Sequence, residues 1–335
     1  MSLDGTPLLI AVLVAVPVTA VLIAAGWDRR GRWRWALRLF SVLTALLSVT
    51  AAVLVQLNRM TEVYSTDTEA QTETKPASDA VNAPATSQLL TLTVAGPASG
   101  LTMTMYAYLP AAYRTGDQRF PVIQALHGYP GSPSAWIKKM QVQSQLDTEI
   151  AAGRMAPTVV LFPSQTPDQL LDTECTNLRN GPQTETFLTV DVPAYAKEHL
   201  RIRDDTRWGL IGFSAGGYCA SSLALRHPTQ YAAAASLSGL AGPGIVVGDG
   251  EEDTTHNVAW RLQNLPSPPV ALWMGWGADE KNARRDSLLV ARVARPPVTV
   301  TTAVVPQGGH SYAVWRQMEG PAFDWLSAHL ARPMP

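Results

Sequence analysis

The stretch from Trp208 to Gly217 reads WGLIGFSAGG, and it decides the fold expected for this chain. An apolar, strand-like run ends in Gly-x-Ser-x-Gly, and an alanine-rich, helix-like run follows at once, at 218–226. Strand, tight turn and helix in this order are typical of a nucleophile elbow, which holds a serine at the N-terminus of a helix. Only small residues fit beside Ser214 in such a turn, hence Gly212 and Gly216. The partial positive charge of the helix end would favour an oxyanion that develops next to Ser214.

A serine of this kind needs a histidine as general base, and His310 is the strongest candidate. It follows a β-branched run at 298–305 and a Gly-Gly pair, which indicates a loop just after a strand. His256, in a polar loop, is the alternative. Three further histidines lie at a helix end or in amphipathic helical stretches and are expected to cap a helix or face solvent: His199, His227 and His329.

The acid of the triad is expected at the end of the strand before the histidine strand. Residues 269–277 form that strand in the prediction, and Asp279 and Glu280 follow it directly. One of the two should hold the imidazole, and Asp279 is favoured over Glu280, although the sequence does not separate them. The other should face solvent or pair with Lys281 or Arg284. Other carboxylates nearby are interpreted as solvated charges: Asp249, Glu251, Glu252, Asp253 and Asp286.

An oxyanion hole needs two backbone N–H donors. The amide of Ala215, directly after the serine, is the first candidate. The second should come from the loop after an earlier strand. A buried-strand pattern at 122–126 runs into His127-Gly128-Tyr129, so the amide of Gly128 or Tyr129 is predicted to be the second donor.

The remaining chain alternates apolar, strand-like runs with helical stretches, which indicates a doubly wound, mostly parallel sheet of the α/β-hydrolase type. Alternating patterns at 91–94 and 101–109 predict an antiparallel hairpin before the main sheet. The predicted strands are 122–126, 158–162, 208–212, 232–237, 270–274 and 298–305. The predicted helices are 135–152, 185–200, 215–226, 257–264, 283–294 and 312–330.

The N-terminal region has the pattern of a two-helix membrane anchor. Residues 8–25 and 39–57 are apolar runs long enough to cross a bilayer, and five arginines lie between or just beside them. An arginine-rich loop is expected in the cytoplasm, which places both termini outside. A signal peptide is disfavoured because Asp4, and no basic residue, precedes the first run. We therefore predict an anchor at 1–58, an extracytoplasmic linker at 59–87 and an enzyme domain at 88–335 of a multi-pass cell-membrane protein.

Composition and cysteine usage limit the remaining possibilities. The chain has 26 basic and 27 acidic residues, so nothing indicates a nucleic-acid partner. The sequence contains no metal-ligand pattern, and no cofactor or metal is expected. Cys175 and Cys219 are the two cysteines. If the domain faces an oxidising compartment, a disulfide between them is expected to tie the polar loop 164–182 beside the serine, the alternative being two free thiols.

Residues 88–332 resemble the putative esterase, or esterase D, branch of the α/β-hydrolases. The resemblance lies in four stretches: HGYPGS at 127–132, GFSAGG at 212–217, SLSG at 236–239, and GGHS at 308–311 with Trp315 beyond. That branch includes S-formylglutathione hydrolases, feruloyl-type esterases, siderophore esterases and mycolyltransferases. The resemblance implies a serine esterase that acts through an acyl-enzyme. Acyl transfer to cell-envelope sugars is the alternative, and a non-catalytic surface-binding protein on a hydrolase scaffold is a second one.

Overall fold

The computed structural model describes residues 86–334, together with positions 35, 38–40, 42–47, 49–50 and 53. The chain divides into two compact units, Met1–Ala77 and Ser78–Pro335. The predicted membrane segment 8–25 lies outside the described residues, as does part of 39–57. Among the positions that are described, no helix has the length and apolar character that a membrane crossing needs.

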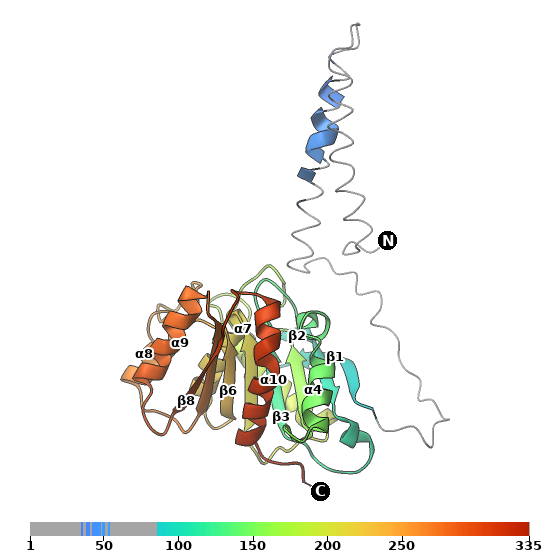
Figure 1. Cartoon of the computed structure of the whole chain (residues 1–335), viewed down its shortest axis with the longest axis vertical. Helices are drawn as coiled ribbons and strands as arrows, with labels where there is room; N and C mark the ends of the chain where they lie inside the picture. The colour runs from blue at the N-terminus through green and yellow to red at the C-terminus, as the bar shows by residue number, and fades with distance from the viewer. Residues whose placement is uncertain are drawn as a thin grey trace, which may run out of the picture. The chain divides into compact units, whose positions relative to one another are not determined.

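An eight-stranded sheet forms the centre of the second unit (Figure 1). Its order is β1-β2-β4-β3-β5-β6-β7-β8. β2 runs antiparallel to both β1 and β4, and the other neighbours are parallel, so the sheet is mostly parallel as predicted. The strands are β1 (Gln88–Gly96), β2 (Leu101–Leu109), β3 (Val122–Leu126), β4 (Val159–Pro163), β5 (Trp208–Phe213), β6 (Tyr231–Leu237), β7 (Ala271–Gly277) and β8 (Thr299–Val305).

Helices cover both faces of this sheet, because its parallel strands are apolar on both sides. One face packs against α5 (Thr184–Thr186), the π-helical turn η2 (Phe187–Asp191), α6 (Val192–His199), α7 (Ala215–Arg226), α8 (Val258–Asn264) and α9 (Lys281–Val293). The other packs against α3 (Ser134–Lys138), α4 (Val142–Ala151) and α10 (Tyr312–His329). Figure 1 shows α4 and α10 together on the face toward the viewer. A short 3₁₀ turn, η1 (Ala111–Arg114), follows β2.

The side chains of β5 pack against the helices on both faces of the sheet. Leu210 packs in the cluster with α7, whereas Ile211 and Phe213 pack in the cluster with α10. All six residues of β5 are buried, so the strand is fixed from both sides. Its carboxyl end therefore presents Ser214 at a defined place in the middle of the sheet, where ligands of open α/β sheets bind.

Two predicted helices differ from the structure. The helix predicted at 135–152 is two helices, because Gln141 adopts a left-handed conformation (φ 59°) and Met140 is buried beside the break. The helix predicted at 185–200 begins one residue earlier and contains the π-helical turn η2. Pro193 lies just after that turn. Because proline has no backbone N–H, the regular helical hydrogen bond to the carbonyl four residues earlier cannot form there.

The predicted disulfide is present. Cys175 and Cys219 are bonded, with 5.6 Å between their Cα atoms and a sequence separation of 44. Both side chains are buried, and Cys219 lies on α7. The bond therefore fastens the loop after β4 to the helix that begins at Ser214.

Replacing both cysteines, Cys175→Ala with Cys219→Ala, is expected to lower the free energy of unfolding by about 4 kcal/mol. A cross-link that closes a loop of this length restricts the unfolded chain by that amount. Guanidinium unfolding under non-reducing conditions measures the change. The wild-type protein with a phosphine reductant serves as the control and should approach the double variant. An unchanged midpoint in the double variant would show that the bond contributes nothing to stability.

Candidate active site

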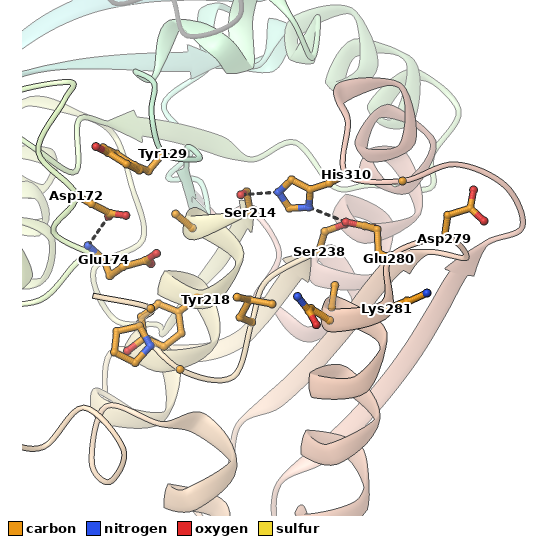
Figure 2. Close-up of a pocket in the computed structure, with 18 residues that line it drawn as sticks. Tyr129, Asp172, Glu174, Ser214, Tyr218, Ser238, Asp279, Glu280, Lys281 and His310 are labelled. Carbon is orange, nitrogen blue, oxygen red and sulfur yellow. Dashed lines mark hydrogen bonds and ion pairs between the residues drawn. The ribbon is translucent and has the colours of Figure 1, made fainter. Parts of the chain in front are cut away.

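The turn at Ser214 is strained in the way that a nucleophile elbow requires. Ser214 has φ 55° and ψ −124°, a combination that L-residues rarely adopt. A Cβ atom on Gly212 would collide with the backbone of Gly216, and one on Gly216 would collide with the carbonyls of Leu126 and His127. Both glycines are therefore needed for the close approach of strand and helix. The strain holds the serine side chain at the mouth of a pocket (Figure 2).

A chain of short hydrogen bonds runs from Ser214 through His310 to Glu280 (Figure 2). The Oγ atom of Ser214 lies 2.7 Å from Nε2 of His310. Nδ1 of His310 lies 2.6 Å from Oε1 of Glu280. The His310 side chain is half exposed and that of Glu280 is buried. This is the geometry of a Ser-His-acid triad, in which the carboxylate sets the imidazole tautomer and leaves Nε2 free to accept the serine proton.

The prediction that Asp279 is the acid of the triad is wrong, because the structure places Glu280 against the imidazole of His310. Glu280 donates its backbone N–H to the Gly277 carbonyl (2.9 Å), and this turn directs its side chain back beneath the end of β7. Asp279 lies one residue earlier on the turn and is exposed. Its Oδ2 accepts the Gly308 amide at 3.1 Å, so it contacts the histidine loop without touching the imidazole.

Glu280 is held by a second set of donors, which sequence reasoning missed. Its Oε2 accepts from the Ser238 hydroxyl at 2.7 Å and from the Gly277 amide at 2.6 Å. Nε1 of Trp315 donates to the Ser238 hydroxyl at 3.0 Å, so that hydroxyl is itself oriented. In the sequence, Ser238 is marked only as part of the SLSG stretch of the family resemblance, and that stretch predicts no function for it. Trp315 also packs edge-on against the His310 ring, with 4.9 Å between ring centroids.

The environment of Glu280 keeps it ionised. Burial raises the pKa of its carboxyl, but hydrogen bonds from His310, Ser238 and the Gly277 amide outweigh burial and leave the pKa below its usual value. A carboxyl group with a lowered pKa is negatively charged at neutral pH. It can therefore stabilise a positively charged His310.

His127 fixes the loop that lies across from Ser214. Burial lowers the pKa of His127 to about 4, so its ring is neutral. The backbone N–H of Gln165 donates to Nε2 of His127 (3.4 Å), so Nε2 carries no proton. The ring proton is therefore on Nδ1, which donates to the Gly128 carbonyl at 2.8 Å. In a trans peptide the carbonyl and the next N–H point in opposite directions. Anchoring the Gly128 carbonyl therefore turns the N–H of Tyr129 the other way.

Two backbone amides beside Ser214 are available to an oxyanion. Gly128 is adjacent to the serine, since a Cβ atom on it would lie 3.2 Å from the Cβ of Ser214. Ala215 is the first residue of α7. Within residues 86–334, neither the amide of Ala215 nor that of Tyr129 has an intramolecular acceptor. Of the two donors considered after β3, the orientation of the loop favours Tyr129 over Gly128.

A pocket of about 610 Å³ opens beside the serine. His310, Glu280 and Asp279 line one part of it, and Asp172 and Glu174 line another. The remaining lining residues come from the loops after β3, β6 and β8, from the elbow with the first turn of α7, and from the start of α9: Tyr129, Ser214, Ala215, Tyr218, Ser238, Leu240, Gly242, Pro243, Gly244, Lys281, Asn282, Ala283 and Gly309. The sequence predicts that the loop 164–182 lies beside the serine, but it does not indicate that Asp172 and Glu174 are the residues of that loop that line the pocket.

The alternative histidine and carboxylates lie elsewhere. His256 is buried, where Nε2 pairs with Asp249 (2.7 Å) and Nδ1 accepts from Arg226 (2.8 Å). Asp249 is thus paired, not simply solvated as predicted. Asp286 was also predicted to be solvated, but it is largely buried, and its carboxylate accepts the Ala241 amide at 3.1 Å and pairs with Arg285.

The fold and this arrangement define an α/β-hydrolase. The family model for putative esterases matches residues 97–330, and the chain belongs to that family. An uncharacterized protein of Corynebacterium glutamicum is 26% identical over 240 residues, which cover 66% of this chain and 56% of the relative. The match thus spans little more than half the length of that relative.

Solved structures share the fold at low sequence identity. A ferulic acid esterase has a TM-score of 0.64 and 17% identity and covers 72% of this chain and 98% of its own. An S-formylglutathione hydrolase from Agrobacterium tumefaciens has a TM-score of 0.63 and 16% identity and covers 75% of this chain and 98% of its own. Both are similar in fold over nearly their whole length.

Proposed function

We propose that this protein is a serine hydrolase of carboxylic esters that works through an acyl-enzyme. The observation that carries the proposal is the continuous hydrogen-bonded chain from Ser214 through His310 to Glu280 at the mouth of a pocket. Membership of the putative esterase family supports the same reaction class. A protein that only binds would not require a strained serine aligned with an imidazole and a buried carboxylate.

The proposed reaction follows from these positions. Nε2 of His310 takes the proton of Ser214 as the serine oxygen attacks the ester carbonyl. Glu280 stabilises the imidazolium, and the amides of Ala215 and Tyr129 bind the oxyanion of the tetrahedral intermediate. His310 then gives its proton to the leaving alcohol. Water, activated by the same histidine, releases the acid and restores Ser214.

A panel of p-nitrophenyl esters of increasing chain length tests this function on the full-length protein in detergent. We expect turnover that saturates with substrate. The same assay with added sugars or simple alcohols separates hydrolysis from transfer, because an acyltransferase would form new esters faster than free acid. Absence of both turnover and fluorophosphonate labelling would favour a non-catalytic binding protein instead.

We also propose that the esterase domain lies on the outer side of the cell membrane, held through residues 8–25 and 39–57. The two apolar runs and the arginine cluster between them support this arrangement. The disulfide supports an oxidising compartment for the domain.

Single cysteines introduced into a Cys175→Ala, Cys219→Ala background test the topology. Gly31→Cys, in the arginine-rich segment, is expected to resist a membrane-impermeant maleimide in intact cells, because that segment would be cytoplasmic. Ser78→Cys, in the linker, is expected to react. Lysed cells provide the control, in which both should react. The reverse pattern in intact cells would refute the orientation.

A further inference from the structure

Asp172 and Glu174, two of the carboxyl groups that line the pocket, have no ion-pair partner among the residues that the structure describes. Asp172 and Glu174 lie on one side of Ser214 in Figure 2, and His310 lies on the other. The Oδ1 atom of Asp172 accepts the backbone N–H of Glu174 at 3.1 Å, which fixes the two residues to each other. Neither carboxyl forms an ion pair with any residue in 86–334.

Glu174 is the more unusual of the two. Its Oε2 atom is buried and has no hydrogen-bond partner among the described residues. Burial, and secondarily the neighbouring Asp172, raise the pKa of Glu174 well above its usual value. Burial also raises the pKa of Asp172. Buried carboxyl groups are normally paired, so an unpaired one that faces a pocket lacks a partner that a ligand can supply.

The loop that carries this pair is fixed in place. Cys175, next to Glu174, is bonded to Cys219 on α7. The Thr173 hydroxyl donates to the Gln165 carbonyl at 2.6 Å, and the Tyr129 hydroxyl donates to the Leu170 carbonyl at 2.8 Å. A preorganised loop of this kind binds a ligand without a large ordering cost.

The direction of the reaction assigns the pair to one part of the substrate. His310 must protonate the leaving alcohol, so the alcohol lies on the His310 side of Ser214. The acyl chain then extends away from His310, toward Asp172 and Glu174. This assignment rests on the proposed ester hydrolysis.

We propose that Asp172 and Glu174 form a cation subsite for the acyl group, so that the preferred substrates are esters whose acyl chain carries an ammonium group. The ammonium donates hydrogen bonds to the two carboxyl groups and supplies the missing countercharge. Where Glu174 is protonated in the empty pocket, binding of the cation releases that proton to solvent. The subsite thus selects for charge at the end of the acyl chain that lies away from the scissile bond.

Matched esters test this selectivity. The p-nitrophenyl esters of ε-aminocaproate and heptanoate differ only by an ammonium in place of a methyl group, and those of β-alanine and butyrate form a shorter pair. We expect the amino ester of at least one pair to have a kcat/KM roughly tenfold or more higher, chiefly through KM, as one charged hydrogen bond would give. Butyrylcholine and its uncharged carbon isostere, which differ in charge on the alcohol side, should be hydrolysed with no such preference.

Variants assign the preference to the two carboxyl groups. Glu174→Gln and Asp172→Asn keep size and remove charge. We expect each to lower the ratio of kcat/KM for the amino ester to kcat/KM for the neutral ester toward one; because both values come from the same variant, the ratio cancels any general loss of activity. Asp253→Asn removes an exposed charge outside the pocket and is the control, with the ratio unchanged.

The outcomes separate this proposal from the proposed function. Neutral esters hydrolysed by wild type without any preference for the amino esters would overturn the cation subsite and leave the esterase standing. A preference that survives both substitutions, or one seen only on the alcohol side, would also overturn it. No hydrolysis of any ester together with no fluorophosphonate labelling would instead count against the esterase itself.

Discussion

Ser214→Ala is expected to lower kcat for ester hydrolysis by at least about a thousandfold. Loss of the nucleophile removes the covalent route, and triad members removed from comparable enzymes cost more than this. The fold should be preserved, since the only hydrogen bond of the hydroxyl within the described part of the chain is to His310, and the glycines around Ser214 hold its strained backbone. Steady-state kinetics with a p-nitrophenyl ester measures the loss.

Ser311→Ala is a matched control for this substitution. Ser311 lies next to His310 in sequence, and its hydroxyl donates one long hydrogen bond (3.3 Å), to the Gly309 carbonyl, among residues 86–334. Deleting it should change kcat by no more than a few fold. Residual turnover of Ser214→Ala above about a thousandth of the wild-type rate, in a protein with an unchanged circular dichroism spectrum, would mean that another group attacks the ester.

Glu280→Gln is expected to reduce kcat by roughly a hundred- to ten-thousandfold. The glutamine can present an NH₂ group to Nδ1 of His310 and so place the imidazole proton on Nε2. That tautomer has no lone pair left to accept the proton of Ser214. The substitution also removes the charge that stabilises the imidazolium. The same ester assay over a range of pH separates this loss from a shifted optimum.

Asp279→Asn is the matched control, because Asp279 is the adjacent carboxylate on the same turn. It is exposed, and among residues 86–334 its side chain forms one hydrogen bond, from the Gly308 amide, which the asparagine side-chain carbonyl can keep. We expect a change of a few fold at most. Near wild-type kinetics for Glu280→Gln combined with a steep loss for Asp279→Asn would reverse the assignment of the acid.

The parts of this site that were predictable have a local sequence signal. The elbow follows from a strand, a small-residue turn and a helix that are contiguous, so Ser214 and its helix were placed correctly. His310 follows a strand and a glycine pair near the C-terminus, which is also a local pattern. Parallel order in the sheet then brings both to the same edge.

The choice between Asp279 and Glu280 could not be made from sequence, because adjacent residues on a turn point in different directions. What decides it is the bond from the Glu280 amide to Gly277, together with the hydroxyl of Ser238 and the indole of Trp315. These groups come from three separate elements. No pattern within the strand end reports their positions.

The acidic pair at Asp172 and Glu174 illustrates the same limit for the pocket. The loop 164–182 has no periodic pattern, so nothing in the sequence says which of its side chains face Ser214. The disulfide between Cys175 and Cys219 could be expected, but the path it imposes on the neighbouring residues could not. The break at Gln141 was missed for a related reason, since the burial of Met140 depends on the core around it.

Mass spectrometry of the protein after reaction with a fluorophosphonate probe tests the central claim most directly. We predict one covalent adduct per chain, mapped to the peptide that contains Ser214, and no adduct on the Ser214→Ala variant. Glu280→Gln should react more slowly, because its histidine no longer activates the serine. An adduct on another residue, or equal labelling of wild type and Ser214→Ala, would contradict the account.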